Sequence, residues 1–177
     1  MASAARNRDV EQIDAFLAQP KRLLPKPPEW TPSSYPREAQ AIWRIEDAAG
    51  LESAHLRFRC HTSRRLHPSV SPIFRRMLVE RVDLAPQDEC KLNPHWAARL
   101  GVPAMVCGSH GHHWSDNRDH LLTDAPWGLP CRRPLPANLR RLPQVLPWLA
   151  CKLDLELSDG WRDFDIPPQT DLFTEGA

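Results

Sequence analysis

Residues 54–61 of the chain read Ala54-His55-Leu56-Arg57-Phe58-Arg59-Cys60-His61. Apolar and basic side chains alternate along it, which is the period of a β-strand that buries one face and exposes the other. The preceding segment Gln40–Asp47 has the features of a second strand, and Ala48-Ala49-Gly50 supplies turn residues between the two. These two segments therefore predict an antiparallel hairpin with one apolar and one basic face.

Elements on both sides of this hairpin complete the predicted order. Asp9–Ala18 has apolar residues at helical spacing and predicts a short amphipathic helix. We expect a third strand within Ile73–Leu84 and a fourth over Val102–Val106. Leu139–Leu153 predicts a second helix, kinked at Pro147. The predicted fold class is α+β: an N-terminal helix, a four-stranded antiparallel meander, an active-site loop and a C-terminal helix.

The length of 177 residues predicts one domain, large enough to bury a core of its own. Nineteen prolines against seven glycines indicate long, stiff connections between the elements. We divide the predicted domain into an N-terminal helix with a Pro-rich segment, the meander, the active-site loop with a Pro-rich insertion, and the C-terminal helix with its tail, over residues 1–36, 37–107, 108–138 and 139–177.

The balance of charges argues against two classes of partner. The chain has 23 Lys and Arg residues against 22 Asp and Glu residues, so net charge favours neither nucleic acid nor an anionic membrane. No stretch approaches the roughly 20 apolar residues of a membrane span. The chain has five cysteines, which is an odd number, and their spacings show no regular pairs. This pattern predicts a cytoplasmic protein with free thiols rather than a set of disulfides.

Groups able to act as nucleophile, base or metal ligand are concentrated between Cys107 and His120. This segment holds four of the eight histidines and one of the five cysteines. It follows the predicted strand Val102–Val106, so the polar cluster should begin where a strand ends in a loop. Binding and catalytic residues are often carried by loops that a rigid element positions. We therefore expect the functional site here.

The order of elements and several short motifs resemble the ubiquitin-conjugating enzymes, in particular divergent bacterial members of that family. In the family a Tyr-Pro-x-x-x-Pro turn precedes the third strand, and the matching residues here are His67–Pro72. We expect Pro72 to begin or precede that strand, because a proline inside the meander would remove a ladder hydrogen bond. The family also has a His-Pro-Asn segment, which Asn93-Pro94-His95 matches in reversed order, and a Gly before the fourth strand, which Gly101 matches. Cys107 stands at the place of the family's catalytic Cys, and Trp114 at the place of the Trp that follows it. The resemblance covers roughly residues 9–153.

This resemblance implies a cysteine-dependent acyl transferase that carries a small modifier protein as a thioester and passes it to an amine. Its partners would be a ubiquitin-like modifier protein and an activating enzyme, and it would need no cofactor. Cys107 would be the nucleophile, with His110 and His112 close enough to accept a proton from the attacking amine. Asn117 or Asn93 would hold the oxyanion. The alternative for Cys107 is a small buried residue at a strand end.

A second hypothesis uses the same segment for a metal ion. His110 and His112 stand two residues apart, so in an extended segment both imidazoles point to the same side. With His120 or Asp116, and with or without the Cys107 thiolate, they would complete a zinc site in a hydrolase or in a structural zinc protein. We favour the metal-free site, and so expect less than stoichiometric zinc and no effect of chelator on the melting temperature. A third hypothesis is a non-catalytic binding subunit, which would not need Cys107.

Overall fold

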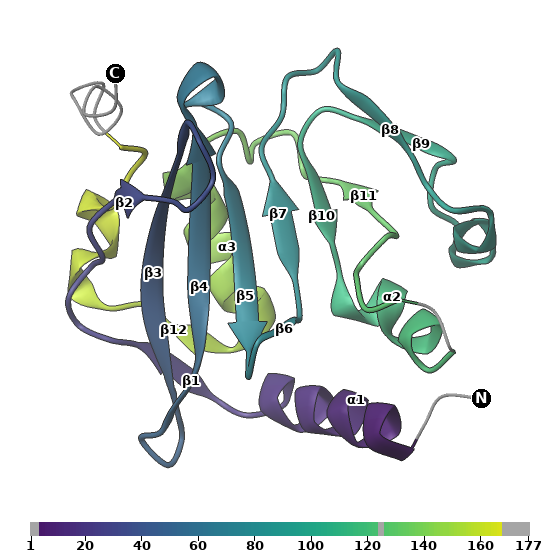
Figure 1. Cartoon of the computed structure of the whole chain (residues 1–177), viewed down its shortest axis with the longest axis horizontal. Coiled ribbons are helices and arrows are strands. Elements are labelled where there is room, and N and C mark those ends of the chain that lie inside the picture. Colours follow the sequence, from purple (N-terminus) through teal and green to yellow (C-terminus); the bar gives the residue numbers. More distant parts are fainter. Residues whose placement is uncertain (1–3, 124–125, 168–177) are drawn as a thin grey trace.

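A long hairpin forms the centre of the sheet (Figure 1). In the computed structural model, which describes residues 4–123 and 126–167, strand β3 (Glu38–Asp47) pairs antiparallel with β4 (Glu52–His61). Every second residue of β4, from Ala54 to Cys60, is buried, because these side chains all point to one face. Asp47 closes the connecting turn by accepting hydrogen bonds from two backbone N–H groups. The predicted hairpin is confirmed.

The predicted four-stranded antiparallel meander is wrong. Within the described residues the main sheet has ten strands, in the order β11-β10-β7-β5-β4-β3-β1-β12, with β2 added on β3 and β6 on β5. It is a mixed sheet because β1 pairs parallel with β12. The strands other than the hairpin are β1 (Lys21–Leu23), β2 (Thr31–Pro32), β5 (Ser69–Phe74), β6 (Met77–Leu78), β7 (Arg81–Asp83), β10 (His110–His112), β11 (Arg133–Pro134) and β12 (Leu155–Glu156). The ubiquitin-conjugating-enzyme-like fold is therefore not the fold of this chain.

The third strand starts earlier than predicted, and Pro72 lies inside it, paired with Leu56. The Pro72 carbonyl accepts a hydrogen bond from the Val79 N–H, so the side of Pro72 that lacks a donor faces away from β4. Strand β7 pairs with β5 only at Ser69 and Val70, and β6 pairs with it beyond Pro72. The proline therefore removes no hydrogen bond from the β4–β5 ladder.

The predicted fourth strand over Val102–Val106 is also wrong. Among the described residues, strand β9 (Met105–Cys107) pairs only with β8 (Cys90–Leu92), in a separate two-stranded sheet that lies beside the main one (Figure 1). The predicted loop at residues 108–138 contains the sheet strands β10 and β11. The short strands β7 and β10, not residues 102–106, extend the main sheet beyond β5.

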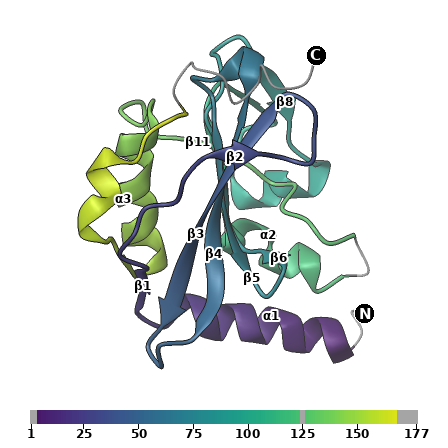
Figure 2. The same cartoon turned by 60° about the vertical axis from the view of Figure 1, so that its left-hand side comes forward.

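Three α-helices accompany the sheet in the described part of the chain: α1 (Ala4–Leu17), α2 (Trp114–Leu121) and α3 (Leu142–Leu153). Helix α3 covers one face of the sheet, as both views show (Figures 1 and 2). Its apolar side chains form one core with those of α1 and the buried face of the hairpin. Helix α1 adds Val10, Ile13 and Phe16 to this core, and the Phe16 ring stacks on Phe74. Both helices were predicted, but α1 starts five residues before the predicted Asp9 and α3 starts three residues after the predicted Leu139.

None of the helices in the described residues is both long enough and apolar enough to span a membrane.

Candidate metal centre

Strand β10 carries the predicted histidines into the main sheet, where it lies between β7 and β11. The strand alternates its side chains, so His110 and His112 point to the same face. In the register with β7, His110 stands opposite Asp83, and His112 stands opposite Arg81. Two adjacent strands thus place two imidazoles, a carboxylate and a guanidinium on one face of the sheet.

The side chains of Asp83, His110 and His112 form a cluster whose potential ligand atoms all lie within 4.8 Å of one another. The Oδ2 atom of Asp83 is 3.4 Å from Nε2 of His110 and 3.3 Å from Nε2 of His112. All three residues are buried, with relative exposures of 9%, 1% and 6% in that order. Buried charged and polar groups of this kind need a partner.

The hydrogen bonds of the two imidazoles fix which nitrogen of each ring faces Asp83. Nδ1 of His110 lies 2.8 Å from the carbonyl oxygen of Gly108, and Nδ1 of His112 contacts the carbonyl oxygen of Leu129. A carbonyl oxygen only accepts, so both Nδ1 atoms donate. On a neutral imidazole, which has one N–H group, this leaves an Nε2 lone pair directed at the carboxylate. Nε2 of His110 accordingly has no hydrogen-bond partner among the described residues.

Electrostatics favour an ionised Asp83 and a neutral His112. Burial alone would raise the pKa of the Asp83 carboxyl, but the charge and the hydrogen bonds of the Arg81 guanidinium are among the interactions that outweigh it, and the pKa lies well below its usual range. Burial lowers the pKa of the His112 imidazole, although the Asp83 charge opposes this. An anionic carboxylate and a neutral imidazole are the forms of these groups that bind metal ions.

Arg81 holds the other oxygen of the same carboxylate. Its Nε and Nη2 atoms lie 2.9 Å and 2.8 Å from Oδ1 of Asp83. Oδ2, the oxygen that faces both imidazoles, is left for another partner. Each potential ligand is thus oriented by a second hydrogen bond: the two rings by backbone carbonyl groups and the carboxylate by a guanidinium. Such outer contacts are characteristic of metal ligands in proteins.

The opposite face of β10 carries a different cluster. A methyl group on Gly111 would lie 2.6 Å from the His113 ring, so the absence of a side chain there gives this ring room. The His113 ring contacts the Glu80 carboxylate, and its Nδ1 lies 2.7 Å from Nζ of Lys152 in α3. The other oxygen of Glu80 accepts the backbone N–H of Trp114 at 2.9 Å. This cluster links the end of β10 to α3. His113 therefore lies on the face of the sheet opposite to His110 and His112.

Cys107, the predicted nucleophile, is joined to Cys90 by a disulfide across the β8–β9 pair. The prediction that all five cysteines are free thiols is therefore wrong for these two. The free cysteines are Cys60 and Cys131, which are buried, and Cys151, which is exposed. Cys107 does not belong to the Asp83 cluster.

The other predicted site residues lie outside the cluster. Asn117 is fully buried, and its amide binds the backbone of Cys131 in both directions and the carbonyl of His113. Asp116 pairs with Arg133 at 2.7 Å, and the His120 ring stacks on Trp96. Asn93 likewise binds backbone groups. The structure thus brings together His110 and His112 but adds neither Asp116 nor His120 to them.

Asp83 is the residue that the sequence analysis missed. Arg81-Val82-Asp83 has the polar–apolar–polar alternation of a short strand, and Val82 is fully buried. That pattern could have marked Asp83 as a side chain on the polar face of the sheet. Its pairing with β10 could not have been found in this way, because the two strands are far apart in the chain.

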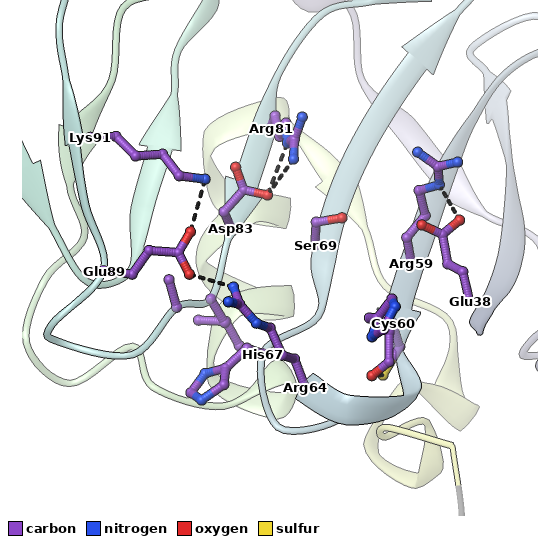
Figure 3. A pocket seen from close by; sticks show the side chains of 13 residues that line it. Glu38, Arg59, Cys60, Arg64, His67, Ser69, Arg81, Asp83, Glu89 and Lys91 are labelled. Atoms are coloured by element: carbon purple, nitrogen blue, oxygen red, sulfur yellow. Dashed lines mark hydrogen bonds and ion pairs between the residues drawn. The ribbon is translucent and has the colours of Figure 1, made fainter. Parts of the chain in front are cut away.

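Beside the cluster lies a hollow on the polar face of the sheet, here called the Ser69 hollow (Figure 3). Its basic lining side chains are Arg59, Arg64, Arg81 and Lys91. Its carboxylates are Glu38, Asp83 and Glu89. Figure 3 shows Arg64 and Lys91 both reaching Glu89, at 2.6 Å and 3.0 Å. Asp83 thus faces both the histidines and an open hollow in which each of the four basic side chains is paired with a carboxylate.

Comparison of the chain with protein-family models, with curated proteins and with solved structures finds no match in any of the three. The function therefore has to be inferred from the geometry of the chain itself.

The environments of the cysteines predict their order of alkylation. Without reductant, iodoacetamide should modify exposed Cys151 first, while Cys60 reacts slowly because burial raises the pKa of its thiol to about 11. Cys90 and Cys107 should react only after mild reduction, because only a free thiolate attacks the reagent. Peptide mapping by mass spectrometry measures this order. Modification of Cys107 ahead of Cys151 in unreduced protein would contradict it.

Proposed function

We propose that the protein binds one divalent transition-metal ion through Asp83, His110 and His112, and that it is a metal-dependent hydrolase. The observation that carries this proposal is the convergence of two imidazole nitrogens and a carboxylate oxygen in a buried place. The Nε2 atoms of His112 and His110 lie 3.3 Å and 3.4 Å from Oδ2 of Asp83. Because both Nδ1 atoms contact carbonyl groups, neutral rings would direct their Nε2 lone pairs at this oxygen. Without a positive charge between them these atoms repel one another.

The distances suit a transition metal in tetrahedral coordination. With bonds of about 2.0–2.1 Å, two ligand atoms of a tetrahedral zinc site lie about 3.3–3.4 Å apart. Both separations between Asp83 and the histidines have this value. A proton on Nε2 of His112 would instead create an imidazolium charge on a ring whose pKa is lowered by burial. A single divalent ion placed between the three side chains would bind all three ligand atoms.

The number of ligands supports a catalytic site over a structural one. Structural zinc sites have four protein ligands, whereas catalytic sites have three and keep one position for water. Among the described residues the cluster has three members. An ion bound there would lower the pKa of its water to about 7 and so supply a hydroxide nucleophile at neutral pH. The Ser69 hollow, which Asp83 also lines, offers room for a substrate.

The thioester-carrier function remains a prediction from the sequence alone. It requires a free thiolate at Cys107, and this sulfur is bonded to Cys90. The cytoplasmic location also remains a prediction, and in a reducing compartment this disulfide would open.

Titration with Co(II) tests the proposed function, because tetrahedral Co(II) absorbs visible light far more strongly than the hydrated ion. We expect one ion per chain. The variants Asp83→Ala and His112→Ala should weaken its binding by more than about 100-fold, since loss of an outer contact alone costs 10-fold to 100-fold. His120→Ala is the matched control, because this histidine stacks on Trp96 away from the cluster. Unchanged binding in Asp83→Ala, or equal losses in all three variants, would refute the proposal.

A further inference from the structure

The Ser69 hollow has a regular arrangement of polar side chains across the sheet. Ser69 of β5 pairs with Arg59 of β4 on one side and with Asp83 of β7 on the other. The three side chains therefore stand in one row on the polar face. Adjacent strands are about 4.8 Å apart, so the backbones of Arg59 and Asp83 are separated by roughly 10 Å, with Ser69 between them. A small group above Ser69 would lie within reach of all three.

Two groups in and beside this row make no hydrogen bond to the described residues. The Ser69 hydroxyl makes no hydrogen bond to any described residue, although it lines the hollow. Arg57 lies two residues before Arg59 on the same strand, and its half-buried guanidinium has no hydrogen bond or ion pair with the described residues. Its charge is close enough to Arg59 and Arg81 for the repulsion among them to contribute, after burial, to lowering its pKa. An anion would relieve this repulsion.

The charges of the hollow also favour an anion once the metal site is filled. Four basic side chains and three carboxylates line it. One of the carboxylates, Asp83, would be neutralised by the bound ion. The Arg59 side chain is held by Glu38 at 2.8 Å and remains 30% exposed, so that a ligand can still reach it.

We propose that the Ser69 hollow binds a phosphate group of the substrate, with one oxygen on the metal ion, one on the Arg59 guanidinium and one on the Ser69 hydroxyl. This inference rests on the proposed function, because the ion at Asp83 supplies one of the three contacts. A tetrahedral phosphate has three terminal oxygens and up to two negative charges, which match three partners on three neighbouring strands. A planar carboxylate has two oxygens and would leave one partner without a contact.

Titration of Co(II)-loaded protein with inorganic phosphate tests this inference. Broadening of the phosphorus NMR signal reports phosphate bound next to the paramagnetic ion. We expect Arg59→Gln to weaken phosphate binding roughly 10-fold or more, because a hydrogen bond to a charged group is lost. Arg44→Gln is the matched control: it removes the same charge from the same face of β3–β4, where Arg44 pairs with Glu52 away from the hollow. This control variant should bind phosphate as the wild type does.

The Co(II) affinity is measured on the same samples. If the ion binds and Arg59→Gln and Arg44→Gln weaken phosphate binding equally, or neither does so, the inference is overturned while the proposed function stands. Acetate that binds as tightly as phosphate would also overturn it. Failure of the wild type to bind Co(II) overturns the proposed function itself. A selective loss in Arg59→Gln, with Co(II) affinity unchanged, supports the phosphate site.

Discussion

Zinc at 1,000 times its dissociation constant is expected to raise the melting temperature by about 8 °C or more. Binding to the folded state alone contributes about 4 kcal/mol at this concentration. For a chain of this size each kcal/mol raises the melting temperature by about 2–4 °C. The three ligands lie on two different strands, β7 and β10, so the ion would cross-link the sheet there. Chelator should reverse the increase, contrary to the expectation from sequence alone.

Differential scanning fluorimetry with and without zinc measures this increase, and two variants control it. Asp83→Ala should abolish it, because the carboxylate ligand is removed. Cys151→Ser should leave it intact, and it excludes an effect of zinc on the exposed free thiol. An equal increase in Asp83→Ala would show that zinc binds elsewhere in the chain.

The second large effect concerns the core. Phe58→Ala is expected to lower the free energy of unfolding by about 3–5 kcal/mol, the usual cost of truncating a buried Phe. Phe58 is fully buried on the central strand β4, and its ring packs edge-on against Phe164 with a centroid distance of 4.7 Å. Removing the ring leaves a cavity where the hairpin meets the C-terminal segment.

Urea unfolding followed by tryptophan fluorescence measures this change. Leu51→Ala in the β3–β4 turn is the control, since Leu51 is 64% exposed and should change the free energy of unfolding by less than about 0.5 kcal/mol. A loss of about 1 kcal/mol or less in Phe58→Ala would contradict the arrangement of the core.

Sequence reasoning succeeded where the determining contacts are local. The hairpin β3–β4 follows from alternation along two neighbouring segments and the turn between them. Helix α3 follows from its apolar spacing, with Pro147 inside it. The position of His110 and His112 on one side of an extended segment was predicted correctly for the same reason.

It failed where distant segments meet. The parallel pairing of β1 with β12 joins segments more than 130 residues apart in the chain (residues 21–23 and 155–156), and no local pattern marks it. The pairing of β7 with β10 brings Asp83 to the histidines. These two strands can pair because the β8–β9 segment between them in the sequence forms a separate sheet. The Cys90–Cys107 disulfide likewise needs two strands in register, which the spacing of the cysteines did not reveal.

The alternation of side chains along β10 determines where such a chain can change in length during evolution. One residue inserted between Gly108 and His112 would exchange the two faces of the strand, turning an imidazole toward α3 and a glycine toward Asp83. The loop between β8 and β9 lies outside the main sheet and can lengthen without moving the ligands. Proteins that inherit this site should therefore keep the spacing of residues 108–112 while varying residues 93–104.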